Sequence, residues 1–257
     1  MIFDTHCHLG LRTDGEVDDP TAAVTRAAAD GITTMLTVGI DLASSQNAQG
    51  FSRGLSASSA CSVLYSAGLH PNSADRFDQE FAALTAICSE DDCTAIGETG
   101  LDYYWDRTTP EEQRRSLEAH LQLAKDRDKP VIIHSRDAHD DTYSVLAGHD
   151  GVRGVIHCFS GGVAEARRAL DLGYYLSFAG PLTYPKATDL RAAAAFASED
   201  RILVETDAPF LTPQPRRGEP NEPAFLVHTL AALAEVRGIA FDDAAALTME
   251  NGRRLFT

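Results

Sequence analysis

Short runs of β-branched and apolar residues alternate along this chain with longer segments of helical composition. Such an alternation predicts a parallel sheet with helices on the outside. Eight runs within 257 residues favour an α/β fold of the closed (β/α)8 TIM-barrel type, a single domain spanning residues 1–257. An open doubly wound sheet is the alternative. The expected strands are 1–5, 32–38, 61–69, 94–98, 131–134, 154–158, 174–178 and 201–206.

The segments that follow the expected strands have the composition or the period of helices. Pro110 before Glu111 and Glu112 is typical of a helix start, because proline fits the first turn and acids favour the positive end of the dipole. Neither GxGxxG nor a P-loop follows the first strand, which excludes the usual nucleotide-binding form of the open sheet. The expected helices are 20–30, 77–89, 110–128, 138–147, 163–172, 188–198 and 224–237, with a short last helix starting at Asp242 and a loop at 212–223.

The charge balance restricts the partners of this chain. It carries 38 acidic and 22 basic side chains, a formal net charge of -16. Phosphate backbones are repelled at long range, which argues against a general nucleic-acid coat or a membrane-surface binder. The five cysteines are an odd number without a CxxC pair, so we expect reduced thiols in a cytoplasmic protein. No apolar run has the length of a membrane helix, and no membrane association is expected.

Residues of metal-binding type stand where the expected strands end. His6 and His8 are two residues apart on one strand, so they share a face and can bind one ion. The carboxyl ends of all strands meet at the mouth of a barrel, where these side chains would converge. Four histidines and two carboxylates exceed the needs of one ion, so two divalent ions bridged by Glu98 fit better. The candidate ligands are His6, His8, Glu98, His134, His157 and Asp207.

A plainer explanation has to be weighed, because a single histidine at a strand end is more often a satisfied polar group than a ligand. Four of the nine histidines end expected strands, which chance does not readily produce. A structural metal is disfavoured because such sites are usually rich in cysteine. Cys7 and Cys158 are instead expected to face away from the site and to pack. The remaining histidines outside strand ends are expected to be solvated or to cap helices: His120, His139, His149 and His228.

Five blocks carry a family resemblance: DTHCHL at 4–9, IGETGLDYYW at 96–105, VIIHSRDA at 131–138, GVIHCFSG at 154–161 and VETDAPFLTP at 204–213. Together and in this order they resemble the TatD family, metal-dependent hydrolases of the amidohydrolase type that are described as deoxyribonucleases. The resemblance implies a (β/α)8 barrel, two divalent metal ions and hydrolysis of phosphodiester bonds, often from a 3′ DNA end. It further implies that His6, His8, Glu98 and Asp207 bind one ion, and Glu98, His134 and His157 the other.

The chemistry of the residues suggests roles around these ions. Asp207 would bind a metal ion and accept the proton of the attacking water as general base, while Glu98 would act as the bridging catalytic carboxylate. Glu205 lies two residues before Asp207 on the same strand face, where a buried charge has to be paired. Asp102 lies four residues after Glu98. We expect both to support ligating histidines. Zn, Mn, Fe and, less well, Mg suit such ligands.

Three further residues are candidates for binding substrate. His70 ends the third expected strand and would contact a phosphate, add a ligand, or serve only as a polar strand-end residue. Arg136 is placed to bind a phosphate or carboxylate through two hydrogen bonds. Arg217 opens a segment similar to the family's RG-x-x-NEP loop. Glu219 and Pro220 occupy positions that are often basic in relatives, which weakens the case for a long DNA strand there.

The leading hypothesis is a 3′-5′ exodeoxyribonuclease that acts on DNA ends or short oligonucleotides, with no obligate protein partner. A metal-dependent esterase or amidase of the same barrel type, such as one hydrolysing aminoacyl esters on tRNA, is the alternative. A non-catalytic component of nucleic-acid repair would lack ligands, and none is missing. Tyr103, Tyr104 and Trp105 either stack on bases or pack at the rim. Cations at the mouth would reverse the local charge, so the net charge favours a short or terminal substrate.

Overall fold

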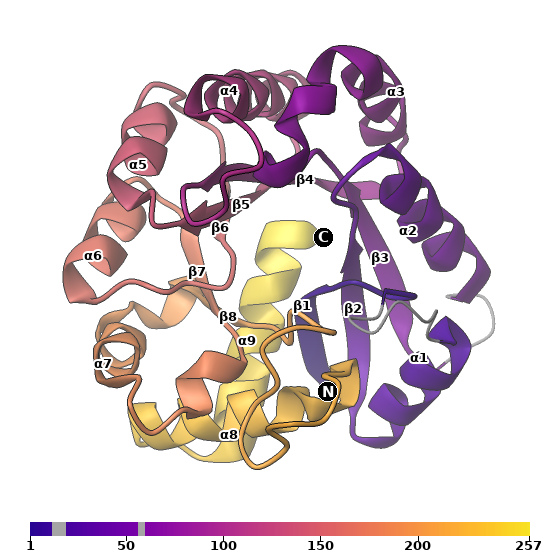
Figure 1. Cartoon of the computed structure of the whole chain (residues 1–257). Coiled ribbons are helices and arrows are strands. Elements are labelled where there is room, and N and C mark those ends of the chain that lie inside the picture. Colours follow the sequence, from indigo (N-terminus) through magenta and orange to yellow (C-terminus); the bar gives the residue numbers. More distant parts are fainter. Residues whose placement is uncertain (12–18, 56–59) are drawn as a thin grey trace.

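Eight parallel strands surround the centre of the molecule (Figure 1). The computed structural model describes residues 1–11, 19–55 and 60–257. Within these residues the strands pair in sequence order, and helices between them lie outside the ring of strands, so the expected (β/α)8 barrel is confirmed. The strands are β1 (Ile2–Cys7), β2 (Ile32–Val38), β3 (Ser62–Ala67), β4 (Cys93–Asp102), β5 (Val131–Arg136), β6 (Gly154–Ile156), β7 (Tyr175–Phe178) and β8 (Ile202–Val204).

The helices begin and end close to the expected positions, with two exceptions treated below. At the start of α4, the Thr109 hydroxyl accepts the backbone N–H of Glu112 at 3.2 Å, and the Glu112 carboxylate accepts that of Thr109 at 2.8 Å. The helices are α1 (Pro20–Ala29), α2 (Leu42–Leu55), α3 (Phe77–Cys88), α4 (Pro110–Arg127), α5 (His139–Ala147), α6 (Val163–Asp171), α7 (Thr188–Phe196), α8 (Leu226–Arg237) and α9 (Phe241–Phe256). Short 3₁₀ helices cover Pro71–Arg76, Gly180–Thr183, Glu199–Arg201 and Pro223–Phe225.

Helix α2 is absent from the expected elements. Its sequence is rich in serine, glutamine, asparagine and glycine, and only Ser45 and Ala48 are buried, so the apolar period that marks a core-facing helix is nearly missing. The sequence contains one indication of a helix start here, the aspartate at position 41. The Asp41 carboxylate accepts the backbone N–H of Ser44 at 2.8 Å, an interaction typical of a helix start.

The first and last strands meet through hydrogen bonds of the chain that follows β8. The N–H of Asp207 donates to the carbonyl of His6 at 2.9 Å, and the N–H of His8 donates to that of Ala208 at 2.8 Å. The fully buried carboxylate of Asp4 accepts the backbone N–H and the hydroxyl of Thr206, at 2.9 and 2.6 Å. This seam places the end of β1 against the segment that carries Asp207.

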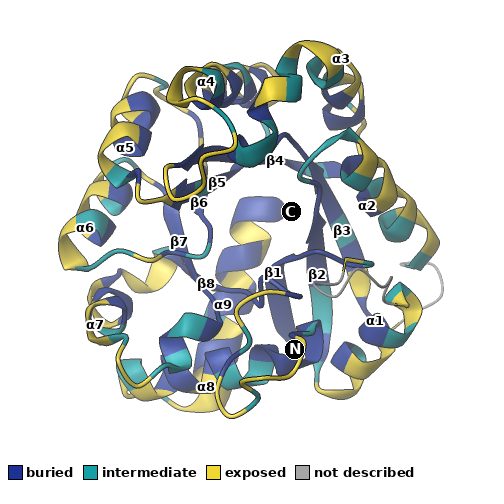
Figure 2. Ribbon diagram, viewed as in Figure 1, coloured by how far each residue is buried: buried dark blue, intermediate teal, exposed yellow. Residues whose placement is uncertain are grey.

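Helix α9 closes the interior of the barrel at the end opposite the mouth. It packs against β1 and β8, and Figure 1 shows it (yellow) inside the ring of strands in projection. Its residues Met249, Leu255 and Phe256 join an interior cluster with inward side chains such as Phe3 of β1. A second, larger apolar layer lies between the sheet and the helices. Most strand residues are coloured as buried in Figure 2. The short last helix expected from Asp242 is therefore a full element whose apolar face completes the core.

His120 contradicts its expected solvated position. It is fully buried in α4, its Nδ1 donates to the carbonyl of Ser116 at 2.7 Å, and its ring lies 5.1 Å from that of Phe81. Among the described residues, its Nε2 has no hydrogen-bond partner. Burial lowers the pKa of His120 to about 4, so the ring is neutral in the folded protein.

This burial predicts an acid-dependent loss of stability. The pKa of His120 in the folded protein lies below its unfolded value, so the unfolded state binds more protons as the pH falls from about 6.5 to about 4. The free energy of unfolding should fall by about 2 kcal/mol between pH 7.5 and 5 from this residue. Urea unfolding in the presence of chelator measures the free energy of unfolding at both pH values. The wild type should show this contribution to the loss, and His120→Phe should lack it. Equal losses in the two proteins would refute this assignment.

Among the described residues, no single helix is long and apolar enough to cross a membrane. One pair bent by 106°, Pro223–Arg237 with Phe241–Phe256, meets the length and composition criteria only jointly.

Candidate metal centre

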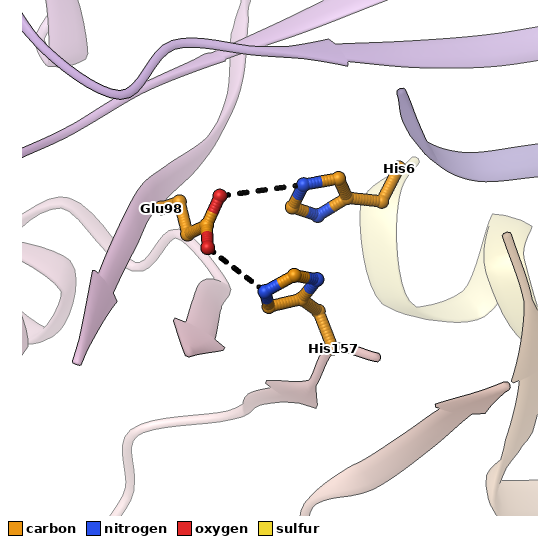
Figure 3. A group of neighbouring side chains, drawn as sticks. All are labelled: His6, Glu98 and His157. Atoms are coloured by element: carbon orange, nitrogen blue, oxygen red, sulfur yellow. Dashed lines mark ion pairs between the residues drawn. The ribbon is translucent and has the colours of Figure 1, made fainter. Parts of the chain in front are cut away.

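Glu98 occupies the centre of the barrel mouth. Its side chain is buried in the middle of β4, which continues four residues beyond it to Asp102, and its two carboxylate oxygens face different histidines (Figure 3). Oε1 lies 2.8 Å from Nδ1 of His134 and 2.8 Å from Nε2 of His157. Oε2 lies 3.4 Å from Nε2 of His6 and 3.9 Å from Nε2 of His8. The carboxylate thus offers one oxygen to each of two pairs of histidines, and the rings of His6 and His157 also stack on each other with their centroids 4.0 Å apart.

The backbone around Glu98 depends on close approach of two strands. At Gly100 the φ angle is +149°, and an added Cβ would lie 2.0 Å from the carbonyl oxygen of His134. A residue with a side chain would push β5, and with it His134, away from β4. Glycine at this position therefore allows the carboxylate and the imidazole to meet.

The first group consists of His6, His8 and Asp207. Nε2 of His6 lies 3.2 Å from Nε2 of His8, as the alternation along β1 predicts. Oδ1 of Asp207 lies 3.7 Å from the former atom and 3.5 Å from the latter. Cys7, between the two histidines, belongs to the apolar layer outside the sheet, so its expected packing position is confirmed.

The second group consists of His134 and His157, each held from behind by a carboxylate. Nδ1 of His134 and Nε2 of His157 are 3.2 Å apart. On the far side of each ring, Nε2 of His134 lies 3.2 Å from Oδ2 of Asp102, and Nδ1 of His157 lies 3.3 Å from Oε1 of Glu205. The structure thus places Asp102 and Glu205 where they orient these histidines.

The donor atoms of both groups fit divalent metal ions. In His8, His134 and His157, the ring nitrogen that points away from the centre donates its N–H to a carbonyl or carboxylate oxygen. In the neutral ring, the lone pair of the other nitrogen is therefore directed at the centre. A bare lone pair beside a carboxylate oxygen is repulsive unless a proton or a cation lies between them. Two imidazole nitrogens on one tetrahedral zinc ion are about 3.3 Å apart. The observed 3.2 Å in each group matches that spacing.

The electrostatics of the centre keep its carboxylates ionised. Burial opposes the charge of Glu98, but His157, His70 and His134 hold its pKa well below the usual value. Burial likewise opposes the charge of Asp207, whose pKa is lowered by His8, His6 and His157. Conversely, burial disfavours the charge of His157, but Glu98 and Glu205 raise its pKa well above the usual value, so a cation bound there would replace a proton on this ring. A metal ligand has to be deprotonated, and both carboxylates meet that condition at neutral pH.

His70 lies within the same centre, with its Nε2 3.4 Å from Oε1 of Glu98. Its Nδ1 accepts the backbone N–H of Asn72 at 3.0 Å, and burial lowers its pKa to about 3. The neutral ring therefore carries its proton on Nε2 and presents a donor rather than a lone pair. His70, Asp102 and His134 also lie close enough to hold an ion. The hydrogen bonds of His70 and Asp102 favour a supporting network there.

The sequence profile described as "TatD related DNase" matches residues 3–257. The chain belongs to this family. The relative YabD of Bacillus subtilis, named an uncharacterized metal-dependent hydrolase, is 34% identical over 261 residues and covers 100% of this chain and 99% of its own. YcfH of Escherichia coli K12, named likewise, is 37% identical over 260 residues, with 100% and 96% covered.

Two further comparisons bear on fold and activity. A protein of Citrobacter koseri named "3'-5' ssDNA/RNA exonuclease TatD" is 37% identical over 256 residues, with 96% of each chain covered. The crystal structure of YJJV, a TatD homolog from Escherichia coli K12, superposes with a TM-score of 0.87 at 29% identity, with 99% of this chain and 97% of that chain covered. The chain is thus a metal-dependent hydrolase of the TatD family with several His, Glu and Asp clusters that could bind metal.

Two arginines expected to bind substrate stand outside the metal centre of this TatD-family protein. The guanidinium carbon of Arg136 lies 3.8 Å from the centroid of the Tyr104 ring. That of Arg217 lies 4.4 Å from the centroid of Tyr184. Both arginines are exposed, and each rests on an aromatic ring at the rim. Their expected phosphate contacts stay predictions.

Two residues that sequence reasoning did not single out hold Asp207 in place. Asp4 binds Thr206 as described above, and Asn221 donates to the carbonyls of Thr206 and Phe210, at 2.9 and 2.5 Å. Asn221 thereby ties the loop after β8 to the strand end that carries Asp207. The available signals were the acid at the start of DTHCH and the asparagine of the NEP segment, both polar residues that the fold buries.

Cys158 does not continue β6, because the strand ends at Ile156 and Cys158 has a φ angle of +42°. Its N–H donates to Oε1 of Glu205 at 2.6 Å. The expected outward direction of Cys158 assumed that the residue continues the strand, and that assumption is wrong. Burial raises the pKa of its thiol well above the usual value, so the thiol is protonated at neutral pH.

Proposed function

We propose that this TatD-family hydrolase cleaves phosphodiester bonds at the 3′ end of single-stranded DNA or short oligonucleotides, with a pair of divalent ions. The division of donors by the Glu98 carboxylate, with one oxygen toward each histidine group, carries the proposal. The name of the Citrobacter koseri relative supports the same activity. The net charge of -16 agrees with a substrate held at one end rather than along its length.

Residues of the centre would have different roles in the reaction, according to where they lie. Bound divalent ions would supply Lewis-acid polarisation of the phosphoryl group and an acidified water. The side chain of Asp207 is 11% exposed, whereas that of Glu98 is 3% exposed. Asp207 is therefore the carboxylate that a water at the mouth can reach, and its lowered pKa keeps it in the ionised form that a general base requires. The N–H on Nε2 of His70, which lies 3.4 Å from Oε1 of Glu98, would be the donor that this residue offers to a phosphate oxygen.

A direct assay tests this function. Metal-depleted protein is supplied in turn with Mg²⁺, Mn²⁺ or Zn²⁺ and incubated with a 5′-labelled single-stranded oligonucleotide. Stepwise shortening is expected, and a terminal 3′ phosphorothioate linkage should block it. A 3′-labelled copy should release the label first. Absence of cleavage with every ion, together with turnover of ester or amide substrates, would replace the nuclease by the esterase or amidase alternative.

A further inference from the structure

The loop after β4 presents two large aromatic side chains to solvent. Tyr104 is 54% exposed and Trp105 is 44% exposed, although Asp102, immediately before this loop, is 1% exposed. Their rings meet edge to face, with centroids 4.9 Å apart. Figure 2 shows the exposed segment between β4 and α4. Side chains that served only to pack the rim would be covered by neighbours, and these two are not.

Two arginine side chains lie against these rings. Arg136 lies 3.8 Å from the Tyr104 ring and 5.9 Å from the Trp105 ring, and Arg107 lies 5.3 Å from the latter. Among the described residues, no ion pair engages Arg136. Its charge is therefore available to an incoming anion, in a protein that is otherwise strongly acidic.

One carboxylate connects this surface to the metal centre. Oδ1 of Asp102 accepts the backbone N–H groups of Tyr104 at 3.0 Å and Trp105 at 3.2 Å. Its other oxygen, Oδ2, lies 3.2 Å from Nε2 of His134. The same side chain thus fixes the start of the aromatic loop and the rear of a candidate metal ligand. The backbone of the aromatic loop is therefore joined to a candidate metal ligand through a single side chain.

We propose that Tyr104, Trp105 and Arg136, the stacking platform, bind the nucleobase next to the phosphate that is cleaved; this inference rests on the proposed function. Aromatic faces stack on any base, and the guanidinium complements the adjoining phosphate. Bases inside a duplex are covered by their neighbours, so the platform selects unpaired ends. The net charge of -16 does not prevent such binding, because the substrate would be attracted only at the stacking platform and at the metal centre.

The chain contains its own reporter for this contact, because Trp105 is its only tryptophan. In the presence of chelator, the fluorescence of the full-length protein is titrated with a short phosphorothioate oligothymidylate. An abasic oligomer of the same length and charge serves as the comparison. Stacking predicts quenching by the first oligomer and little change with the second. Equal quenching by both would overturn the proposal, since the base would then contribute nothing.

Variants test the same contact through turnover. Tyr104→Ala and Trp105→Ala should each raise KM for single-stranded DNA by about ten-fold, with a smaller effect on kcat. Trp105→Phe, which keeps a ring, should recover most of the loss. The matched control is Phe196→Ala. Phe196 on α7 is also exposed, and its ring centroid lies 4.6 Å from the guanidinium carbon of Arg167 on α6, away from the aromatic loop. It should leave KM unchanged.

The two proposals fail in different ways. If the wild type cleaves DNA but neither platform variant changes KM, the stacking platform is wrong and the nuclease stands. If the wild type cleaves no phosphodiester while base-dependent quenching persists, the platform stands as a nucleotide site and the nuclease is wrong.

Discussion

Asp207→Asn should lower kcat for phosphodiester hydrolysis by about 10²- to 10⁴-fold, the usual loss when a positioned acid–base group is removed. The amide keeps an oxygen that can bind metal but has no basic lone pair to accept a proton at neutral pH. Asp207 has a φ angle of +54°, a left-handed conformation that asparagine also adopts readily. The backbone at the seam between β1 and β8 should therefore stay as it is.

The measurement combines steady-state kinetics with elemental analysis. Metal content should be close to that of the wild type, which separates loss of the base from loss of the ion. Asp128→Asn is the matched control, because Asp128 has a φ angle of +50° and lies exposed at the end of α4. It should leave kcat unchanged. An Asp207→Asn protein that holds metal and turns over normally would remove Asp207 from the role of base.

Glu98→Gln should weaken binding of divalent ions by more than about 100-fold, because replacing groups that merely orient ligands already costs 10- to 100-fold. Each oxygen of Glu98 faces one histidine group, and the amide can offer an oxygen to only one of them. The amide nitrogen then points toward a ring nitrogen or toward the cation. Affinity should fall for at least one ion, and turnover with it.

Titration calorimetry with Zn²⁺ or Mn²⁺ measures the affinities and the number of ions bound. Glu250→Gln on α9 provides the control, since its carboxylate is exposed and far from the mouth. Urea unfolding in chelator confirms that the variant is folded. A Glu98→Gln protein with two ions at wild-type affinity would show that Glu98 is not the shared ligand.

The barrel and the positions of its candidate ligands were predictable because their signals are local. Eight apolar runs, six of which have a histidine, glutamate or aspartate at or just past the end, require only strand alternation and the common direction of parallel strands. His6, His8, Glu98, His134, His157 and Asp207 converge for this reason.

The rest depends on neighbours that the sequence does not reveal. Helix α2 buries too few apolar residues to show a period. His120 faces the core because Phe81 of another helix lies against it. Asp4 and Asn221 are buried by contacts across the seam, between segments that are far apart in the chain. Arg136 rests on Tyr104 because of the path of a loop, which residue spacing does not determine.

The seam has a consequence for how the molecule acquires activity during synthesis. Hydrogen bonds there join residues 199 and 202 positions apart in a chain of 257 residues. His6 and His8 leave the ribosome early, but Asp207 and the loop tied by Asn221 follow much later. A chain that stops before Asp207 therefore has at most five of the six candidate ligands and no closed barrel around them. Contacts of such sequence separation also form slowly. The candidate metal centre is thus completed only when the chain that follows β8 pairs with β1.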